Sequence, residues 1–429
     1  MARPRKVRRV PRCAHRAVTV ILSLALLASL ALAPAGAAGH GSQPQDELVV
    51  GAILDLGSGW TSLGRASRVT RELAVADANA ALTRRGSPLR VRLRVADARG
   101  EPENALRELR RLAASGVRVV LGPQGSSEVA AVRRAATSLG VVLISQGSTA
   151  HSLAYAGDNV LRFVPDDLRE GEAVVALLRR DRIDAVVPAW RRDAGNAGLV
   201  RSVRRQFVAA GGKVSSGVSY PTKTMSFEGV VSSISRQAAA LRSSGVKRVG
   251  VYLAGFDEVV DLLRAASSDP ALAMPWYGSD GVALTTRLIA DRAVATFAHS
   301  VGYPNPTVGL SDSLVRRARP VLMRARKTLG RDPDAFALTA YDALRIAVEA
   351  HERSGASGGA SLRRAVVAAA NAHVGVTGKM TLNRAGDRAY GNFDFWSVCP
   401  GGGKFRWVRT YQYAARGAGS GRIVARARC

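Results

Sequence analysis

Short apolar segments alternate with helical segments from Leu48 onward, and this alternation restricts the chain to one class of fold. The apolar segments are rich in Val, Ile and Leu and lack a clean polar alternation, which is typical of parallel strands covered on both faces. The expected strands are 48–54, 91–95, 117–121, 141–144, 160–164, 185–187, 214–219 and 248–253. The expected helices between them include 64–80, 127–139, 198–210 and 227–242. Repeated strand–helix units of this kind predict a doubly wound α/β fold.

A single sheet with this many strands would be unusually wide, so we expect two doubly wound parallel-sheet lobes. No flexible linker interrupts the middle of the chain, which favours lobes joined by several crossings of an ordered hinge. The best candidates for these crossings are Pro165 and the segment Gly302-Tyr303-Pro304. The predicted division is 47–164 plus about 303–388 for lobe 1, and 165–302 plus about 389–429 for lobe 2.

The C-terminal part departs from this alternation. The expected elements are helices at 312–328 and 333–352, a Gly/Ser loop at 355–361, and strands at 378–382, 391–398 and 405–413. A turn at 399–403 with three consecutive glycines indicates that the last two strands pair antiparallel. Cys399 and Cys429 are the two cysteines after the leader, and in an oxidising compartment we expect them to form a disulfide. Two unpaired thiols are the alternative.

The first residues have the layout of a secretory leader. Residues 1–16 carry seven cations and no acid, 17–33 form an apolar run, and small residues follow at 33–38. This layout predicts a signal peptide over 1–38 and an exported protein, periplasmic, extracellular or associated with the cell surface. An uncleaved N-terminal anchor is the alternative. Because Cys13 precedes the apolar run, the leader is not that of a lipoprotein, and no transmembrane segment is expected after cleavage.

The charge of the chain raises the question of a nucleic-acid partner. The 429 residues include 62 Lys or Arg against 33 Asp or Glu, which gives a formal net charge of +29. The cations are spread over all the predicted helices, and aromatic residues make up only 5% of the chain. No basic run is interleaved with aromatic residues, so we expect a solvated Arg-rich surface and no nucleic-acid binding.

The sequence lacks the motifs that would carry catalysis or hold a cofactor. No Lys-Ser or Lys-Thr follows the glycines of a P-loop, and no Gly-x-Gly-x-x-Gly opens the first helix. A Gly-x-Ser-x-Gly nucleophile turn is missing, and the histidines are scattered without metal-ligand spacing. We therefore expect no catalytic residue, no cofactor and no metal site. A secreted α/β enzyme is the least favoured function.

Four loops at the carboxyl ends of predicted strands are suited to a ligand, because ligands of open α/β sheets bind there. These loops are 122–128, 145–149, 254–257 and 276–281. The first two combine glycines with hydroxyls that could bind a carboxylate, and the fourth presents Asp280 as a counter-charge for a cation. Helix capping is the alternative for each, in the case of Asp280 for a helix starting near Val282. Asp167 and Glu170 are expected to form a capping box at a helix start.

These loops, together with segments on both sides of them, resemble the type I periplasmic binding proteins, especially the Leu/Ile/Val-binding branch that serves ABC importers. The resemblance covers about 47–412. The most specific pieces are Leu121-Gly122-Pro123 with Ser126-Ser127, Ile144-Ser145 with Ser148-Thr149, Trp276-Tyr277-Gly278-Ser279-Asp280-Gly281, Asp332-Pro333-Asp334-Ala335-Phe336 with Tyr341-Asp342-Ala343-Leu344, and Gly378-Lys379-Met380-Thr381-Leu382 with Gly386-Asp387.

The resemblance implies an amino-acid zwitterion held at both ends between two closing lobes. The implied ligand-binding residues are Ser126, Ser127, Gly147, Ser148 and Thr149 for the α-carboxylate, Asp280 for the α-ammonium, and the aromatic residues Phe256, Phe336 and Trp60 near the cleft. An ABC permease is the partner of an importer, and an exported sensor of the same fold is the alternative. Two aromatic positions of the family carry Leu63 and Gly195 here, so the resemblance does not define the side-chain selectivity.

Overall fold

The computed structural model of the protein describes residues 46–57, 60–355 and 357–429. The leader expected over 1–38, with Cys13, lies outside the described residues. Within the described part of the chain, no helix has both the length and the apolar character needed to cross a membrane.

The first sheet has five parallel strands in the order β2-β1-β3-β4-β5. They are β1 (Glu47–Leu54), β2 (Arg90–Asp97), β3 (Val119–Leu121), β4 (Val142–Ser145) and β5 (Val160–Arg162). Adjacent residues of a strand point to opposite faces of the sheet, so this sheet has a core on each side. Leu121 and Ile144 face one core, whereas Val120 and Leu143 face the other.

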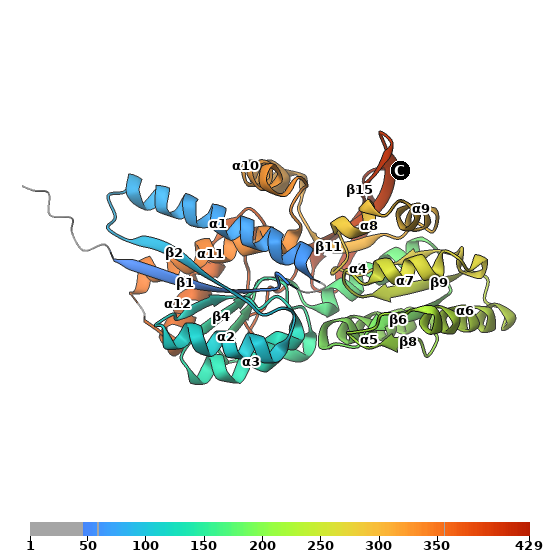
Figure 1. Ribbon diagram of the computed structural model, residues 1–429, viewed down its shortest axis with the longest axis horizontal. Coiled ribbons are helices and arrows are strands. Elements are labelled where there is room, and N and C mark those ends of the chain that lie inside the picture. The colour runs from blue at the N-terminus through green and yellow to red at the C-terminus, as the bar shows by residue number, and fades with distance from the viewer. Residues whose placement is uncertain (1–45, 58–59, 356) are drawn as a thin grey trace, which may run out of the picture. The chain divides into compact units, whose positions relative to one another are not determined.

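Helices cover both faces of the first sheet (Figure 1), and we call the sheet with these helices lobe 1. One face carries α1 (Thr61–Arg84), α11 (Ala335–Ser354) and α12 (Gly359–Ala372), and the other carries α2 (Pro102–Ala114) and α3 (Ser126–Ser138). A further helix, α10 (Asp312–Leu329), packs against α1. The inner strands β1, β3 and β4 are buried on both faces and read as apolar runs, whereas the edge strand β2 carries Arg at alternate positions.

The second sheet, with its helices, is lobe 2. It has the order β10-β9-β6-β7, with β8 also pairing with β6, and all of these pairs are parallel. The strands are β6 (Ala185–Arg191), β7 (Lys213–Val214), β8 (Val218–Tyr220), β9 (Val249–Ala254) and β10 (Trp276–Tyr277). The helices are α4 (Asp167–Arg180) and α5 (Ala194–Ala209) on one face, and α6 (Glu228–Ser243), α7 (Val259–Ala266) and α9 (Arg292–Ser300) on the other.

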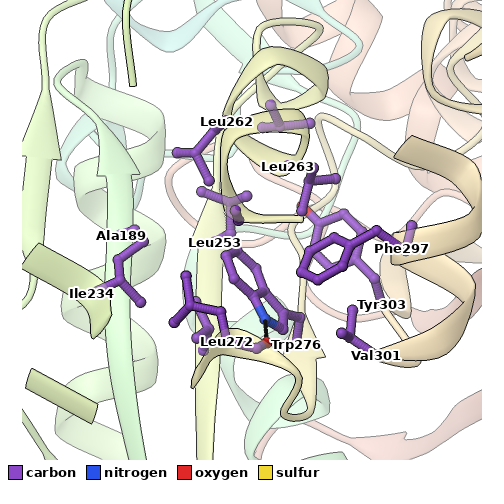
Figure 2. Close-up of a cluster of buried hydrophobic side chains, with 14 of the residues drawn as sticks. Ala189, Ile234, Leu253, Leu262, Leu263, Leu272, Trp276, Phe297, Val301 and Tyr303 are labelled. Carbon is purple, nitrogen blue, oxygen red and sulfur yellow. Dashed lines mark hydrogen bonds between the residues drawn. The ribbon is translucent and has the colours of Figure 1, made fainter. Parts of the chain in front are cut away.

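Trp276 is the largest buried side chain in the core of lobe 2. It packs against Leu253 of β9 and Phe297 of α9, and the two rings meet edge to face with centroids 5.8 Å apart (Figure 2). The indole Nε1 donates a hydrogen bond of 3.0 Å to the carbonyl of Leu272, so the one polar atom of this side chain is satisfied. This contact fixes the short strand β10, which leads directly into the loop with Asp280.

A third, antiparallel sheet has the order β11-β14-β15-β16. Its strands are β11 (Asn305–Gly309), β14 (Asn392–Gly401), β15 (Lys404–Gly417) and β16 (Ser420–Ala425). Val398 contributes to one core of lobe 2, and Phe393, Phe395 and Tyr413 contribute to the other. Cys399 and Cys429 form a disulfide with their Cα atoms 5.2 Å apart.

The predicted fold class is confirmed, because two parallel sheets, each covered by helices on both faces, account for most of the described chain. The exact lobe boundaries stay a prediction. The chain passes between the elements of the two parallel sheets at 163–166, near Pro165, and again at 301–309, where β11 enters the third sheet. It passes a third time after Asp387.

Three predicted elements were wrong, and the alternative for Asp280, a helix starting near Val282, is wrong as well. Helix α12 occupies part of the expected loop 355–361, and its buried residues Leu362, Val366 and Ala369 have the helical spacing that identifies it. The expected strand 214–219 is split into β7 and β8, and only 378–379 of the expected strand 378–382 forms a regular strand, β13. No helix starts at Val282, because the next helix begins at Thr286.

Arg162 at the end of β5 forms a buried ion pair that holds lobe 1 together. Its guanidinium donates two hydrogen bonds to Asp387, of 2.7 and 2.6 Å, and a third of 2.6 Å to the carbonyl of Ala150. The side chains of Arg162 and Asp387 are only 1% and 3% exposed. The pair therefore ties the loop after β4 to a segment that is distant in sequence.

We predict that Asp387→Asn lowers the free energy of unfolding by about 3–5 kcal/mol, because it leaves the Arg162 charge buried without a counter-ion. Urea denaturation followed by circular dichroism measures the change. The matched control is Glu47→Gln, which breaks an exposed ion pair with Arg92 and should change stability by less than about 1 kcal/mol. Equal losses in the two variants would contradict this role of the pair.

Candidate functional site

The carboxyl ends of the parallel strands of both lobes face one cavity of about 490 Å³. Its lining residues all follow strands: Trp60 after β1, Arg99–Pro102 after β2, Gly125–Glu128 after β3, Gly147 and Thr149 after β4, Arg191–Asn196 after β6, Lys223 after β8, Phe256 and Glu258 after β9, and Asp280 after β10. This is where open α/β sheets bind their ligands. The structure thus brings all four of the predicted loops together.

Hydroxyl groups form one wall of the cavity at the start of α3. The Ser126 hydroxyl accepts a hydrogen bond of 3.2 Å from the Ala150 N–H and lies 3.0 Å from the Ser148 hydroxyl. Ser148 itself lies behind this wall and does not line the cavity. The Ser127 hydroxyl accepts a bond of 3.2 Å from the Ala194 N–H of lobe 2. The N-cap of α3 is Gly125, so helix capping does not explain the two serines.

The loop after β4 is held rigidly beside this wall. The Ser145 hydroxyl donates a bond of 2.7 Å to the Pro123 carbonyl and accepts one of 3.0 Å from the Ser148 N–H. Gly147 packs so tightly that a Cβ atom there would lie 2.6 Å from the Gln124 side chain. Because both loops are fixed by these contacts, Ser126 and Thr149 are preorganised for a polar group in the cavity.

A buried cation lies behind the same two loops. The Arg71 guanidinium donates a bond of 2.7 Å to Gln146, whose amide donates one of 2.7 Å to Gln124. Burial lowers the pKa of Arg71 to about 9, so the group is still charged at neutral pH. Arg71, together with the N-terminus of α3, gives this side of the cavity a positive potential that suits a carboxylate.

Three carboxyl groups of lobe 2 form a second charged cluster at the site. Asp280 lines the cavity and is 8% exposed, and its backbone N–H donates a bond of 3.2 Å to Glu170 of α4. Asp167, also on α4, is fully buried next to Thr149, whose carbonyl accepts a bond of 2.8 Å from the Asp167 N–H. Both oxygens of Asp167 and one oxygen of Glu170 lack a hydrogen-bond partner among the described residues.

Burial raises the pKa of all three of these carboxyls. The pKa of Asp167 rises to about 8, because desolvation outweighs the partial offset from the Thr149 side chain. Burial and the nearby carboxylate of Asp280 raise the pKa of Glu170 well above its usual range, and burial also raises that of Asp280. The predicted capping box of Asp167 and Glu170 is wrong: Asp166 is the N-cap residue, and its side chain accepts from the Leu168 N–H. The two acids are instead buried beside Asp280 and do not line the cavity themselves.

Aromatic rings from the two lobes meet at the cavity. Trp60 of lobe 1 and Phe256 of lobe 2 are stacked with centroids 4.1 Å apart, and both line the cavity. Phe256 fits only because residue 281 is glycine, since a Cβ atom there would lie 2.4 Å from the ring. Phe336 does not line the cavity, because it is buried behind Trp60 in a small apolar cluster with Leu63.

The comparisons with known proteins agree with this geometry. The family model described as "Periplasmic binding protein" matches residues 47–398. The chain belongs to this family.

This periplasmic binding protein is also 26% identical over 382 residues to an uncharacterized protein of Methanocaldococcus jannaschii, covering 84% of this chain and 89% of that one.

Solved structures of binding proteins share the fold at low sequence identity. The substrate-binding protein LivJ of Streptococcus pneumoniae, in complex with isoleucine, has a TM-score of 0.68 at 19% identity, covering 89% of this chain and 100% of that one. The leucine-binding protein LivK of Thermotoga maritima has a TM-score of 0.70 at 19% identity, covering 84% of this chain and 97% of that one. An ABC transporter solute-binding protein of R. palustris, in complex with benzoate, has a TM-score of 0.68 at 18% identity, covering 89% of this chain and 98% of that one. The family and these neighbours are binding proteins.

Sequence reasoning missed several charged residues of this periplasmic binding protein. Glu128, Arg191 and Glu258 line the cavity but were not predicted as site residues. Asp167 and Glu170 were noticed, but only as caps. Asp166, Asp167 and Glu170 place three acids at a single helix start, which is more than one cap requires, and this excess was the available signal.

We predict that the stability of the unliganded protein falls as the pH rises from about 4 to about 8. Unfolded Asp167 loses its proton near its ordinary pKa of 3.8, whereas the folded state keeps it up to about 8, so the folded state binds more protons in between. Asp167→Asn should therefore raise the free energy of unfolding at pH 8 by about 1 kcal/mol or more. Urea denaturation across this pH range tests it. The exposed control Asp261→Asn should leave the pH profile unchanged, and an unchanged profile in Asp167→Asn would contradict the prediction.

Proposed function

We propose that this protein is an exported solute-binding protein that captures an amino acid between its two lobes and delivers it to an ABC importer. One observation carries the proposal: a single cavity has hydroxyls and amides backed by Arg71 at one side and the carboxyl of Asp280 at the other. An amino acid presents a carboxylate and an ammonium group on one carbon. It therefore matches both sides at once.

Electrostatics favour such a zwitterion over a ligand with one charge. Hydrogen bonds to charged groups contribute about 1.5–3 kcal/mol each, and a charge buried without a partner costs more than that. Isoleucine and benzoate, the ligands of two structural neighbours, both contain a carboxylate, but only isoleucine has an ammonium group. Asp280 lines the cavity and offers its carboxyl to an ammonium group, which benzoate lacks. We therefore favour an amino acid over an aromatic acid.

The proposed mechanism is closure of the lobes around the ligand. Direct contacts already join the two sides of the cavity: the Trp60–Phe256 stack, the bond from Ala194 to Ser127, and an ion pair of 3.4 Å between Lys223 and Glu101. A ligand held from both sides binds the closed form better than the open form and shifts the equilibrium toward it. An importer would recognise the closed form, whereas a sensor of the same fold would signal through it. The family membership supports the importer.

We predict that the double variant Ser126→Ala with Thr149→Val weakens the binding of an amino acid by about 10- to 100-fold, because it removes two hydroxyl donors from the carboxylate. The affinity for the corresponding decarboxylated amine should fall much less, because the amine has no carboxylate. Isothermal titration with L-leucine, L-lysine and their decarboxylated amines measures both. Ser138→Ala, on the exposed end of α3, is the control and should bind like the parent protein.

In the same titrations, Asp280→Asn should weaken the binding of the amino acid and of the amine alike, because both ligands carry the ammonium group. Equal losses for the amino acid and the amine in the double hydroxyl variant would contradict the carboxylate assignment. Absence of binding by any amino acid to the parent protein would contradict the proposed function as a whole.

A further inference from the structure

A second pair of buried carboxyls lies on the lobe 1 side of the cavity, away from Asp280. Asp55 directly follows β1. Glu128 lies in the first turn of α3 and lines the cavity. Their side chains are held in place by backbone donors: Gly100 donates a bond of 2.6 Å to Asp55, and Gly125 donates one of 3.2 Å to Glu128. The two residues are only 1% and 2% exposed.

Each of these two carboxyls has one oxygen without a donor. Asp55 Oδ2 and Glu128 Oε1 are buried and have no hydrogen-bond partner among the other described residues. Burial raises the pKa of both groups, and the negative charge of Asp55 raises that of Glu128 further. Two carboxylates so close together cannot both ionise at low cost unless a cation joins them. The two side chains are also hydrogen-bonded to each other, so the pair can share one proton, and a cation that bridges the two oxygens would take the place of that proton.

The cations at the cavity form their ion pairs with other acids, although the charge of Arg191 partly offsets the raised pKa of Asp55 and of Glu128. Arg191 forms ion pairs of 3.1 Å with Asp193 and 3.5 Å with Glu258, and it lies over the Phe256 ring at 4.9 Å. Lys223 pairs with Glu101 at 3.4 Å. The other two, Arg99 and Arg192, have exposed side chains, and Arg192 donates to the Ser219 hydroxyl while Arg99 lies 4.0 Å from Asp97.

The cavity is lined by five acids, Glu101, Glu128, Asp193, Glu258 and Asp280, and by four cations, Arg99, Arg191, Arg192 and Lys223, although the chain has a formal net charge of +29. Two buried clusters adjoin it, Asp280 with Asp167 and Glu170, and Glu128 with Asp55, and of these five residues only Asp280 and Glu128 line the cavity. A single α-ammonium group could neutralise only the first of these clusters. The second cluster requires a positive group of its own.

We propose that the ligand carries a second positive group at the end of its side chain, an ammonium or a guanidinium, and that Asp55 and Glu128 bind it. The ligand class is then a dibasic amino acid. This inference rests on the proposed function and names the substrate class of the same site.

The layout of the cavity suits such a molecule. Ser126 and Glu128, both in the first turn of α3, line the same cavity, so one small molecule can contact both. Trp60 lies beside this turn, because its ring is 3.4 Å from where a Cβ atom of Gly125 would be. The apolar faces of Trp60 and Phe256 would then cover the methylene groups between the two charged ends.

The experiment compares pairs of ligands that differ in one charge. L-lysine is norleucine with a terminal ammonium group, and L-arginine differs from L-citrulline by a guanidinium in place of a neutral urea group. Isothermal titration of the full exported chain should give affinities at least about tenfold higher for lysine or arginine than for its neutral partner. Titration in two buffers of different ionisation enthalpy should also show more proton release with the dibasic ligand.

Two conservative variants test the assigned residues. Glu128→Gln and Asp55→Asn keep an oxygen that accepts the bond from Gly125 or Gly100, but remove the charge. Each should lower the affinity for the dibasic ligand by about tenfold or more and leave the neutral ligand unchanged or tighter. Glu72→Gln, on the exposed face of α1, is the matched control and should change neither the affinity for the dibasic ligand nor that for the neutral one. Thermal melting without ligand verifies that each variant folds.

The outcomes separate this inference from the proposed function. If norleucine and citrulline bind as tightly as lysine and arginine, the second cation subsite is wrong while amino-acid binding stands. If Glu128→Gln and Asp55→Asn weaken neutral and dibasic ligands equally, the pair has only a structural role and the inference is again overturned. If no amino acid binds but calcium chloride alone gives a binding isotherm that Glu128→Gln abolishes, both proposals fail and the pair is a metal subsite.

Discussion

Buried carboxyl groups without enough cations around them determine the behaviour of this cavity. Ionising such a buried group without a partner costs several kcal/mol, so the group either stays protonated or is stabilised by a positively charged partner. The cost is sustained because the surrounding strands and helices are rigid: Asp280 follows a strand fixed by Trp276, and Asp167 and Glu170 belong to the first turn of α4. In the proposed mechanism, the ligand provides the missing positive charge, and binding and ionisation become one event.

The two parallel sheets make this arrangement possible. Most of their strands end at the cavity, so residues far apart in the chain, such as Ser126 and Asp280, contribute to one site without a long loop. Helix starts also gather there, and the N–H groups of α3 suit a negative group while the acids of α4 suit a positive one. The same architecture thus supplies both signs of charge within one small volume.

Much of this could be predicted from the sequence. The strand–helix alternation gave the fold class, and the loops after strands gave Ser126, Thr149, Phe256 and Asp280 as neighbours of one cavity, since parallel strands end at the same edge. The roles of Asp167, Glu170 and Glu128 were not predicted, because a first-turn acid looks the same in sequence whether it caps a helix or is buried; only the excess of acids at the start of α4 pointed to a further role. Phe336 has the expected aromatic character, but it is buried in an apolar cluster with Leu63 and Trp60 and does not line the cavity.

The third sheet has a consequence for the order in which the molecule can assemble. Phe393, Phe395 and Tyr413 complete a core whose other members, such as Val174 and Tyr252, are synthesised more than a hundred residues earlier. Lobe 2 therefore remains an unfinished hydrophobic surface until nearly the whole polypeptide has emerged. A truncated product would expose that surface to aggregation, so neither lobe can be isolated by cutting the chain once.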